Sequence, residues 1–198
     1  MDILNFTGIS TLICAFLILL FCIIFKKENF LDVRSVIKRH LALFENCKSQ
    51  YWIFYFLPAV LATGISLIYR AQETFYSNLS VILSIILSIL LAILSILATK
   101  DYTSADKDCD SEEKKRRKER LKISIKETNN VILFDTLLCV VLLLYNLIIT
   151  IILESEIKLF VFTNIFTGIA CYLFIVVLLN LLLVIKRISK LIDIGIDI

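Results

Sequence analysis

The 198-residue chain has little of the chemistry that tight turns, metal sites and acid–base catalysis require. Proline occurs once and glycine four times, which leaves few positions for the turns of a β-rich fold. With His40 as its single histidine, the chain lacks the parts of a histidine-based metal centre or a Ser-His-Asp triad. The six cysteines form no C-x-x-C pair, so they indicate reduced, packing thiols and neither zinc nor disulfides. The sequence therefore disfavours an enzyme and calls for no cofactor.

Long hydrophobic runs are what the chain has in excess. Hydrophobic residues make up 59% of it, whereas soluble domains are usually roughly 45–50% apolar. Five runs are almost free of charge: 3–25, 51–69, 77–99, 131–153 and 159–185. A helix of about 20 apolar residues crosses a bilayer, and an open strand cannot, because its backbone would stay unpaired in lipid. We therefore expect residues 1–198 to form one all-α integral membrane domain.

The links between the runs predict the architecture. The second and third runs are joined by 70–76 and the fourth and fifth by 154–158, so each pair is expected to form an antiparallel hairpin. The first run, 3–25, has no basic flank and no cleavage pattern of a signal peptide. The expected bundle has five transmembrane helices, or four if 3–25 lies in the interface.

Lysine and arginine predict the orientation of the bundle. Of the 21 basic residues, all except Arg70 and Lys158 lie in 26–50, in 100–130 or in the tail after residue 185. Short loops rich in lysine and arginine stay in the cytoplasm. We therefore expect a multi-pass membrane protein with its N-terminus outside and its C-terminus in the cytoplasm.

Two of the expected spans carry small residues on one face. In 77–99 this face consists of Ser80, Ser84, Ser88, Ala92, Ser95 and Thr99. In 51–69 it consists of Ala59, Ala62, Thr63 and Ser66. Small residues let helix backbones approach closely, so we expect these two faces to pack within the first hairpin. The alternative is that the serines line a polar pore in an oligomer.

A few polar residues lie inside the apolar runs. Asp135 is the only ionisable residue among them, and such residues are functional candidates. It lies only five residues into its run, so we expect its side chain to reach the cytoplasmic interface. Asn146, Asn164 and Asn180 are expected to form hydrogen bonds between helices rather than a permeation path.

The two basic loops are expected to be largely helical. In 26–50, the residues Phe30, Val33, Ile37, Leu41 and Phe44 follow helical spacing. Arg34, Lys38 and Arg39 give the same loop a basic character. This pattern predicts an amphipathic helix on anionic headgroups at the membrane surface, or one packed on a neighbour or soluble partner. In 100–130, acids precede bases without a helix breaker, so we expect one helix from about 111 to 153.

The densest charge is a basic run on this helix: Lys114, Lys115, Arg116, Arg117, Lys118, Arg120 and Lys122. Such a run fixes topology on anionic lipid and can also bind an acidic soluble protein. Nucleic acid is disfavoured as a partner, because no aromatic residue between Tyr102 and Phe134 offers a stacking surface. We expect membrane lipids, further copies of the chain and a soluble cytoplasmic protein as partners.

In outline the chain resembles small multi-pass proteins of bacterial anti-phage defence operons, above all the membrane component of the Kiwa system. The resemblance is carried by the hairpins 51–99 and 131–185 and by the charged helix 111–130, and it spans the whole chain in layout. Over 30–130 the chain is also similar to two-helix membrane effectors. The Kiwa resemblance implies a homo-oligomer in the bacterial inner membrane, such as a tetramer, that senses membrane disturbance and works with a cytoplasmic DNA-binding effector. It implies no role for any single residue.

Three functions are compatible with these features of the sequence. The first is an oligomeric sensor or scaffold subunit of an anti-phage defence complex that recruits a cytoplasmic effector. The second is a pore-forming effector, an ion channel built around the serine face. The third is a small carrier or lipid-handling protein, which is disfavoured because carriers usually have broken helices and buried ions near the middle of the membrane.

Overall fold

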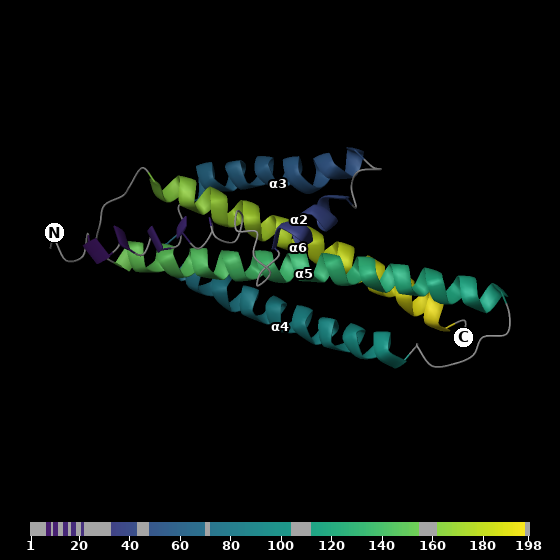
Figure 1. Ribbon diagram of the computed structural model, residues 1–198. Coiled ribbons are helices and arrows are strands. Elements are labelled where there is room, and N and C mark those ends of the chain that lie inside the picture. Colours follow the sequence, from purple (N-terminus) through teal and green to yellow (C-terminus); the bar gives the residue numbers. More distant parts are fainter. Residues whose placement is uncertain are drawn as a thin grey trace.

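The computed structural model describes residues 33–42, 48–69, 72–103, 112–154 and 162–196, together with positions 7–8, 10–11, 14–15, 17–18 and 21. All labelled elements in these ranges are α-helices (Figure 1). They are α2 (Val33–Ala42), α3 (Lys48–Ile68), α4 (Glu73–Thr103), α5 (Glu112–Glu154) and α6 (Phe162–Ile196). The span expected over 3–25 falls largely outside the described residues.

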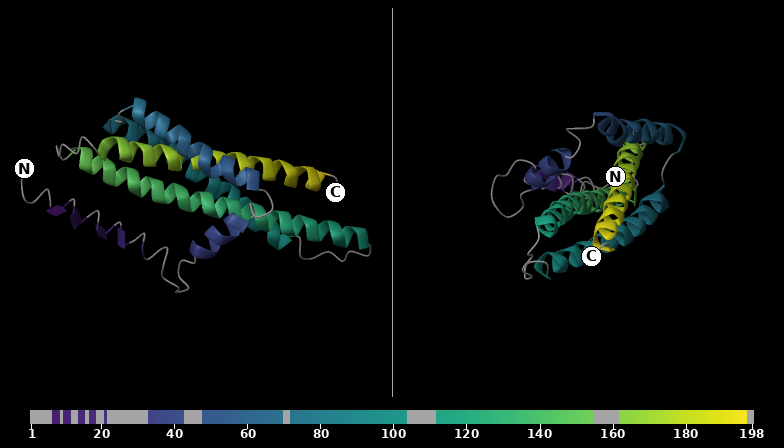
Figure 2. Two further views of the ribbon diagram at one scale, coloured as in Figure 1. Left: turned by 90° about the horizontal axis from the view of Figure 1, so that it is seen from above. Right: turned by 90° about the vertical axis from the view of Figure 1, so that its right-hand side faces the viewer.

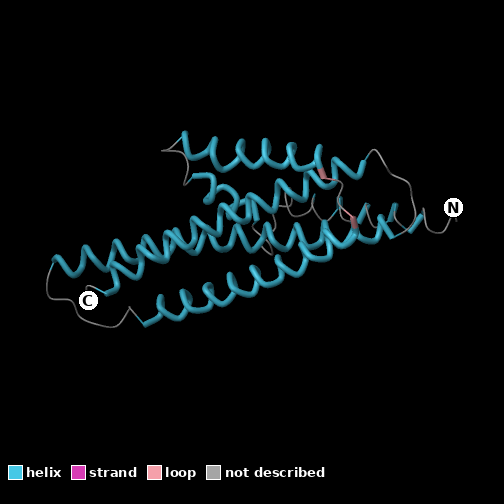
Figure 3. Tube along the Cα trace, turned by 180° about the vertical axis from the view of Figure 1, so that it is seen from behind, coloured by secondary structure: helices cyan, strands magenta, loops and turns pink. Residues whose placement is uncertain are grey.

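The four long helices follow a spatial order that differs from their order in the chain. α3 packs against α6, α6 packs against α5, and α5 packs against α4. α3 and α4 therefore form the two edges of the bundle, and α5 and α6 lie between them (Figure 3). α5 and α6 run antiparallel, as the sequence predicts for 131–153 and 159–185.

The expected packing of 51–69 against 77–99 is wrong. α3 and α4 contact each other along no part of their described lengths. They come together only at the turn, where the ring centroids of Tyr69 and Phe75 lie 5.8 Å apart. A short link brings the ends of two helices together but does not bring their faces into contact. α6 occupies the position that the hairpin prediction assigned to the partner helix.

The small face of α3 packs on α6 instead. Ala62 is buried, and Ser66 lies 3.4 Å from the place where a Cβ atom on Gly168 would be. Gly168 thus gives α3 a close approach to α6. Thr63 is exposed, and its hydroxyl donates to the carbonyls of Ala59 and Val60 in its own helix.

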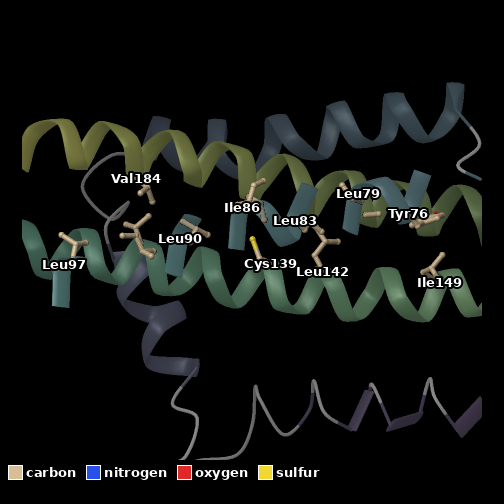
Figure 4. Packing of buried hydrophobic residues seen from close by; sticks show 14 of the residues in the cluster. Tyr76, Leu79, Leu83, Ile86, Leu90, Leu97, Cys139, Leu142, Ile149 and Val184 are labelled. Atoms are coloured by element: carbon tan, nitrogen blue, oxygen red, sulfur yellow. The ribbon is translucent and has the colours of Figure 1, made fainter. Parts of the chain in front are cut away.

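The hydrophobic core lies between α4, α5 and α6 (Figure 4). α4 turns a leucine-rich face toward α5, and Cys139 and Leu142 of α5 meet it from the other side. The buried residues of this α4 face are Tyr76, Leu79, Leu83, Ile86, Leu90 and Leu97. Burial of this apolar surface stabilises the three-helix arrangement in water, whereas in lipid close packing supplies most of the stabilisation.

Three helices are long and apolar enough to cross a membrane. The qualifying stretches are Glu73–Ala98, Glu119–Glu154 and Asn164–Ile192. The apolar part of α3, Trp52–Ile68, is shorter, at about 25 Å by helix rise against a hydrocarbon thickness of about 30 Å. The expectation of an all-helical chain with apolar, membrane-compatible helices is confirmed at this level.

The long helix expected over 111–153 is present as α5, Glu112–Glu154. α6 continues to Ile196, beyond the end at residue 185 that the apolar run suggested. Polar side chains end a hydrophobic run but do not end a helix, because the backbone hydrogen bonds continue until a breaker occurs. The extension of α6 places its basic residues beside the first half of α5.

Candidate functional site

Basic residues of three separate segments lie in the part of the bundle that contains the start of α5 and the end of α6. α2 packs on α5 nearer the middle of the bundle, at Phe134. We call this region the basic end and define it as α2, residues 112–127 of α5 and residues 186–192 of α6. Its exposed bases, among the side chains that the structure describes, are Arg34, Lys38, Arg39, Arg116, Arg120, Lys122, Lys126, Lys186 and Lys190. The sequence predicts the individual clusters, and the fold brings them into the same part of the bundle.

The first turns of α5 carry the basic run that the sequence singles out. Arg116, Arg120 and Lys122 are exposed on the helix. Lys114, Lys115, Arg117 and Lys118 belong to the same turns, but their side chains lie outside the described part of the structure. The helix dipole adds positive potential at this terminus, which favours an anionic partner.

One ion pair fixes the register between α5 and α6 at the basic end. The Arg187 guanidinium donates a hydrogen bond to the Glu127 carboxylate at 2.8 Å. The two side chains remain 21% and 46% exposed, so the pair contributes about 0–1 kcal/mol. The ion pair acts mainly on the register of α5 against α6. This register determines which residues of the two helices face each other deeper in the bundle.

α2 crosses α5 at a steep angle and packs on it near Phe134 (Figures 2 and 4). Val33 and His40 are its buried residues. The His40 ring stacks on the Phe134 ring, with centroids 3.9 Å apart and planes only 7° from parallel. Burial, with a smaller contribution from the nearby Arg187 cation, lowers the pKa of His40 to about 4. His40 is therefore neutral at physiological pH.

The apolar face expected for this helix is only partly correct. Val33 is buried as predicted, but Leu41 is exposed and the neighbouring His40 takes the buried position. The spacing Val33, Ile37, His40 fits a helix face as well as Val33, Ile37, Leu41 does. A neutral histidine ring can stack flat on an aromatic ring, and hydrophobicity alone does not reveal this preference.

A polar layer lies in the core between α5 and α6. Asp135 is fully buried and Asn180 is 1% exposed. The Asn180 amide faces the Asp135 carboxyl, but neither side chain has a hydrogen bond of ordinary length and geometry within the described residues. The expectation that Asp135 reaches the interface is wrong, because its position on α5 points it toward α6 and not outward.

A second polar contact joins α4 and α5 farther along the bundle. The Asn146 amide donates to the Ser80 hydroxyl at 3.4 Å, which is a weak hydrogen bond between helices. The side-chain amide oxygen of Asn146 is buried without a hydrogen bond in the described residues. This weak contact between α5 and α4 is of the interhelical kind expected for Asn146.

The remaining serines of α4 lie on its outer surface. Ser84, Ser88 and Ser95 are exposed. The hydroxyls of Ser84 and Ser88 donate to backbone carbonyls four residues earlier, at 2.8 Å each. Both serines line an open, mainly apolar groove of about 640 Å³ between α4 and α5, together with residues such as Leu143 and Leu147. Because their hydroxyls are satisfied internally, this face can contact lipid or another helix without a desolvation penalty for an unpaired donor.

A third set of contacts closes the opposite end of the core. The hydroxyl groups of Tyr76 and Thr167 lie 3.2 Å apart and join α4 to α6. The Tyr145 hydroxyl donates to the backbone carbonyl of Phe166 at 3.0 Å and joins α5 to α6. α4, α5 and α6 are therefore tied by polar contacts as well as by apolar packing.

Metal chemistry has no obvious site in this arrangement. In the part of the chain that the structure describes, no group of three or more His, Cys, Asp or Glu side chains could hold a metal ion. Cys139 and Cys171 are free thiols buried among apolar residues.

The chain was compared with protein-family models, curated proteins and solved structures. None of the three comparisons finds a match. The function is therefore inferred from the geometry of the basic end and of the polar layers.

Proposed function

We propose that this protein is an oligomeric scaffold and sensor subunit in a bacterial inner membrane, of the kind found in anti-phage defence complexes. In this proposal α3 to α6 lie in the membrane, the C-terminus lies in the cytoplasm and the basic end faces the cytoplasm. The first half of α5 presents a docking surface for a soluble protein with acidic surface residues.

The single observation that carries the proposal is the continuity of α5. The helix runs unbroken from Glu112 to Glu154, so the basic turns are a rigid extension of a core helix. From Glu112 to Glu127 this extension is about 22 Å long by helix rise. A helix whose only task is to cross a bilayer needs no such extension, and a docking arm does.

Charge reversal tests the docking surface. Arg116→Glu combined with Arg120→Glu replaces two exposed bases on one side of the extension. We expect this variant to reach the membrane but to lose a soluble protein that co-purifies with the wild type in fixed stoichiometry. Lys186→Glu combined with Lys190→Glu, which also reverses two exposed bases, is the matched control and should retain the partner. Retention of the partner by both variants would exclude the α5 extension as the docking surface.

A second candidate function is a pore formed by several copies around the α4 face. The observation that favours it is the exposure of Ser84 and Ser88 on an edge helix, where no described helix of the same copy covers them. Ser84→Leu combined with Ser88→Leu should abolish ion flux in liposomes if these serines line a pore. Under the scaffold proposal the wild-type protein conducts no ions, and the variant changes only helix association.

A further inference from the structure

The outward surface of α2 has its own chemistry, distinct from the face that packs on α5. Arg34 and Lys38 are exposed one helical turn apart, and Leu41 follows on the same side, 39% exposed. Arg39 is exposed beside them. A short helix with basic side chains and one projecting leucine is the composition of helices that lie at a lipid–water interface.

The neighbouring part of α6 continues this chemistry. Lys186 and Lys190 are exposed at the basic end. The residues just before them, Leu182 and Ile185, are 62% and 55% exposed. The basic residues therefore begin where an exposed apolar surface ends, which is the arrangement at the boundary between acyl chains and headgroups.

At the basic end, the described basic side chains outnumber the described acidic ones. Among the side chains described at the basic end, the acids are Glu119 and Glu127, and Glu127 is already paired with Arg187. Asp135 follows Phe134, the α5 residue on which α2 packs, but its side chain is buried in the core. Among the described side chains, the exposed bases of α2 and α6 therefore outnumber the acids, and an anionic surface can neutralise this excess of positive charge.

α2 is also the helix whose position depends on the fewest contacts. Among the described helices it packs only on α5, and it buries only Val33 and His40. An isolated ten-residue helix is marginal in water, so α2 needs external contacts to remain folded and docked. A ligand on its outward surface can supply them.

We propose that Arg34, Lys38 and Arg39 of α2 bind the headgroups of anionic phospholipids, with Lys186 and Lys190 of α6 adding positive charge toward the same end of the bundle, and that this binding holds α2 against α5. The inference rests on the proposed membrane location. An acidic soluble protein fits less well, because exposed Leu182 and Ile185 lie just before Lys186 and α2 carries exposed Leu41. Among the described residues of the α5 extension, Ile123 is the one large apolar side chain that is exposed.

Amide hydrogen exchange of α2 tests the proposal on the full chain. The protein is placed in nanodiscs of phosphatidylcholine alone or of an equal mixture with phosphatidylglycerol. We expect exchange in Val33–Ala42 to be about tenfold or more slower with phosphatidylglycerol, because each base near an anionic surface contributes to binding. The effect should weaken as ionic strength rises.

Two triple variants make the test specific. Arg34→Gln, Lys38→Gln and Arg39→Gln together should remove the phosphatidylglycerol effect. Arg116→Gln, Arg120→Gln and Lys122→Gln together remove the same charge from the α5 extension and should keep the effect. Unchanged exchange in the core of α5 shows that each variant is folded.

The proposal is overturned if the two lipid compositions give the same α2 exchange in the wild type. It is equally overturned if the α2 triple variant keeps the lipid effect, if both triple variants lose it, or if the α2 variant loses a soluble partner. Failure of the proposed function is a separate result, because it would appear as a protein that cannot be recovered from membranes or that has no partner.

Discussion

At the scale of single residues, the buried pair Asp135 and Asn180 has the clearest energetic consequence. A carboxyl group taken from water into a helical core is costly unless polar groups compensate it. Asn180 is the polar group that faces it, and Arg187 is engaged by Glu127 nearer the end of the bundle. The contributions of Asp135 and Asn180 to the free energy of unfolding are therefore expected to depend on each other.

Replacement of one member should cost more than replacement of both. We expect Asn180→Leu to lower the free energy of unfolding by about 1–3 kcal/mol, because the buried Asp135 carboxyl then loses the polar group that faces it. Asp135→Leu combined with Asn180→Leu should recover most of this loss, because no polar group stays buried. Thermal unfolding in detergent measures both variants. A double variant as unstable as Asn180→Leu would show that the two side chains are not coupled.

His40 gives α2 a pH dependence whose sign follows from its lowered pKa. Docked His40 has a pKa of about 4 against 6.5 when released, so the released form binds the proton more tightly. Docking is therefore strongest above pH 6.5 and weakens as the pH falls from 6.5 toward 4. Arg187 is the charged group that acts on the ring, and Glu127 is its ion-pair partner. On α2 itself, the nearest charged residues in the sequence are the exposed Lys38 and Arg39.

Hydrogen exchange of Val33–Ala42 relative to the α5 core, at neutral pH and near pH 5, measures this effect. We expect the relative protection of α2 to fall at the lower pH in the wild type. His40→Phe keeps an aromatic ring on Phe134 but has no titrating group, so its relative protection should be the same at both values. A wild type without pH dependence would mean that His40 does not hold α2 in place.

At the scale of elements, the length of α5 is more predictable from the sequence than the partner of α3. α5 matches its prediction within about one residue at each end, because charge order, dipole and absence of breakers all act within the helix. The partner of α3 could not be predicted, because a small face fits any helix that offers a matching surface. Gly168 offers one on α6, and no local pattern distinguishes it from the serine face of α4.

A larger side chain in place of Gly168 tests the contact between α3 and α6. Gly168→Leu should lower the free energy of unfolding by about 1–3 kcal/mol, because atoms of Ser66 already lie 3.4 Å from the added Cβ position. Gly64→Leu is the matched control, because nothing lies within 4 Å of its added Cβ. Thermal unfolding in detergent compares the two. Equal losses would contradict the packing of α3 on α6 at this point.

At the scale of the whole molecule, the distribution of charge and the helix order give one consistent arrangement. The basic end gathers segments that are far apart in the sequence, and the opposite end of the core is joined by Tyr76, Thr167 and Tyr145. The sequence predicts this charge asymmetry from loop composition alone. The buried layer at Asp135 and the docking of His40 depend on three-dimensional register, and residue spacing does not determine them.

Reporter fusions test the proposed orientation. A fluorescent protein fused after Ile198 should fluoresce, because we propose that this end is cytoplasmic. A phosphatase that is active only outside the cytoplasm should be active when it is inserted after Glu154. The same phosphatase fused after Ile198 is the control and should be inactive. The opposite pattern would reverse the proposed topology.

The mass and composition of the complex test the central claim most directly. The tagged protein is extracted from its own cells in mild detergent, and the mass and the components of the particle are determined. The account predicts several copies of this chain together with a soluble protein in fixed stoichiometry. A monomer that carries no other protein would contradict it.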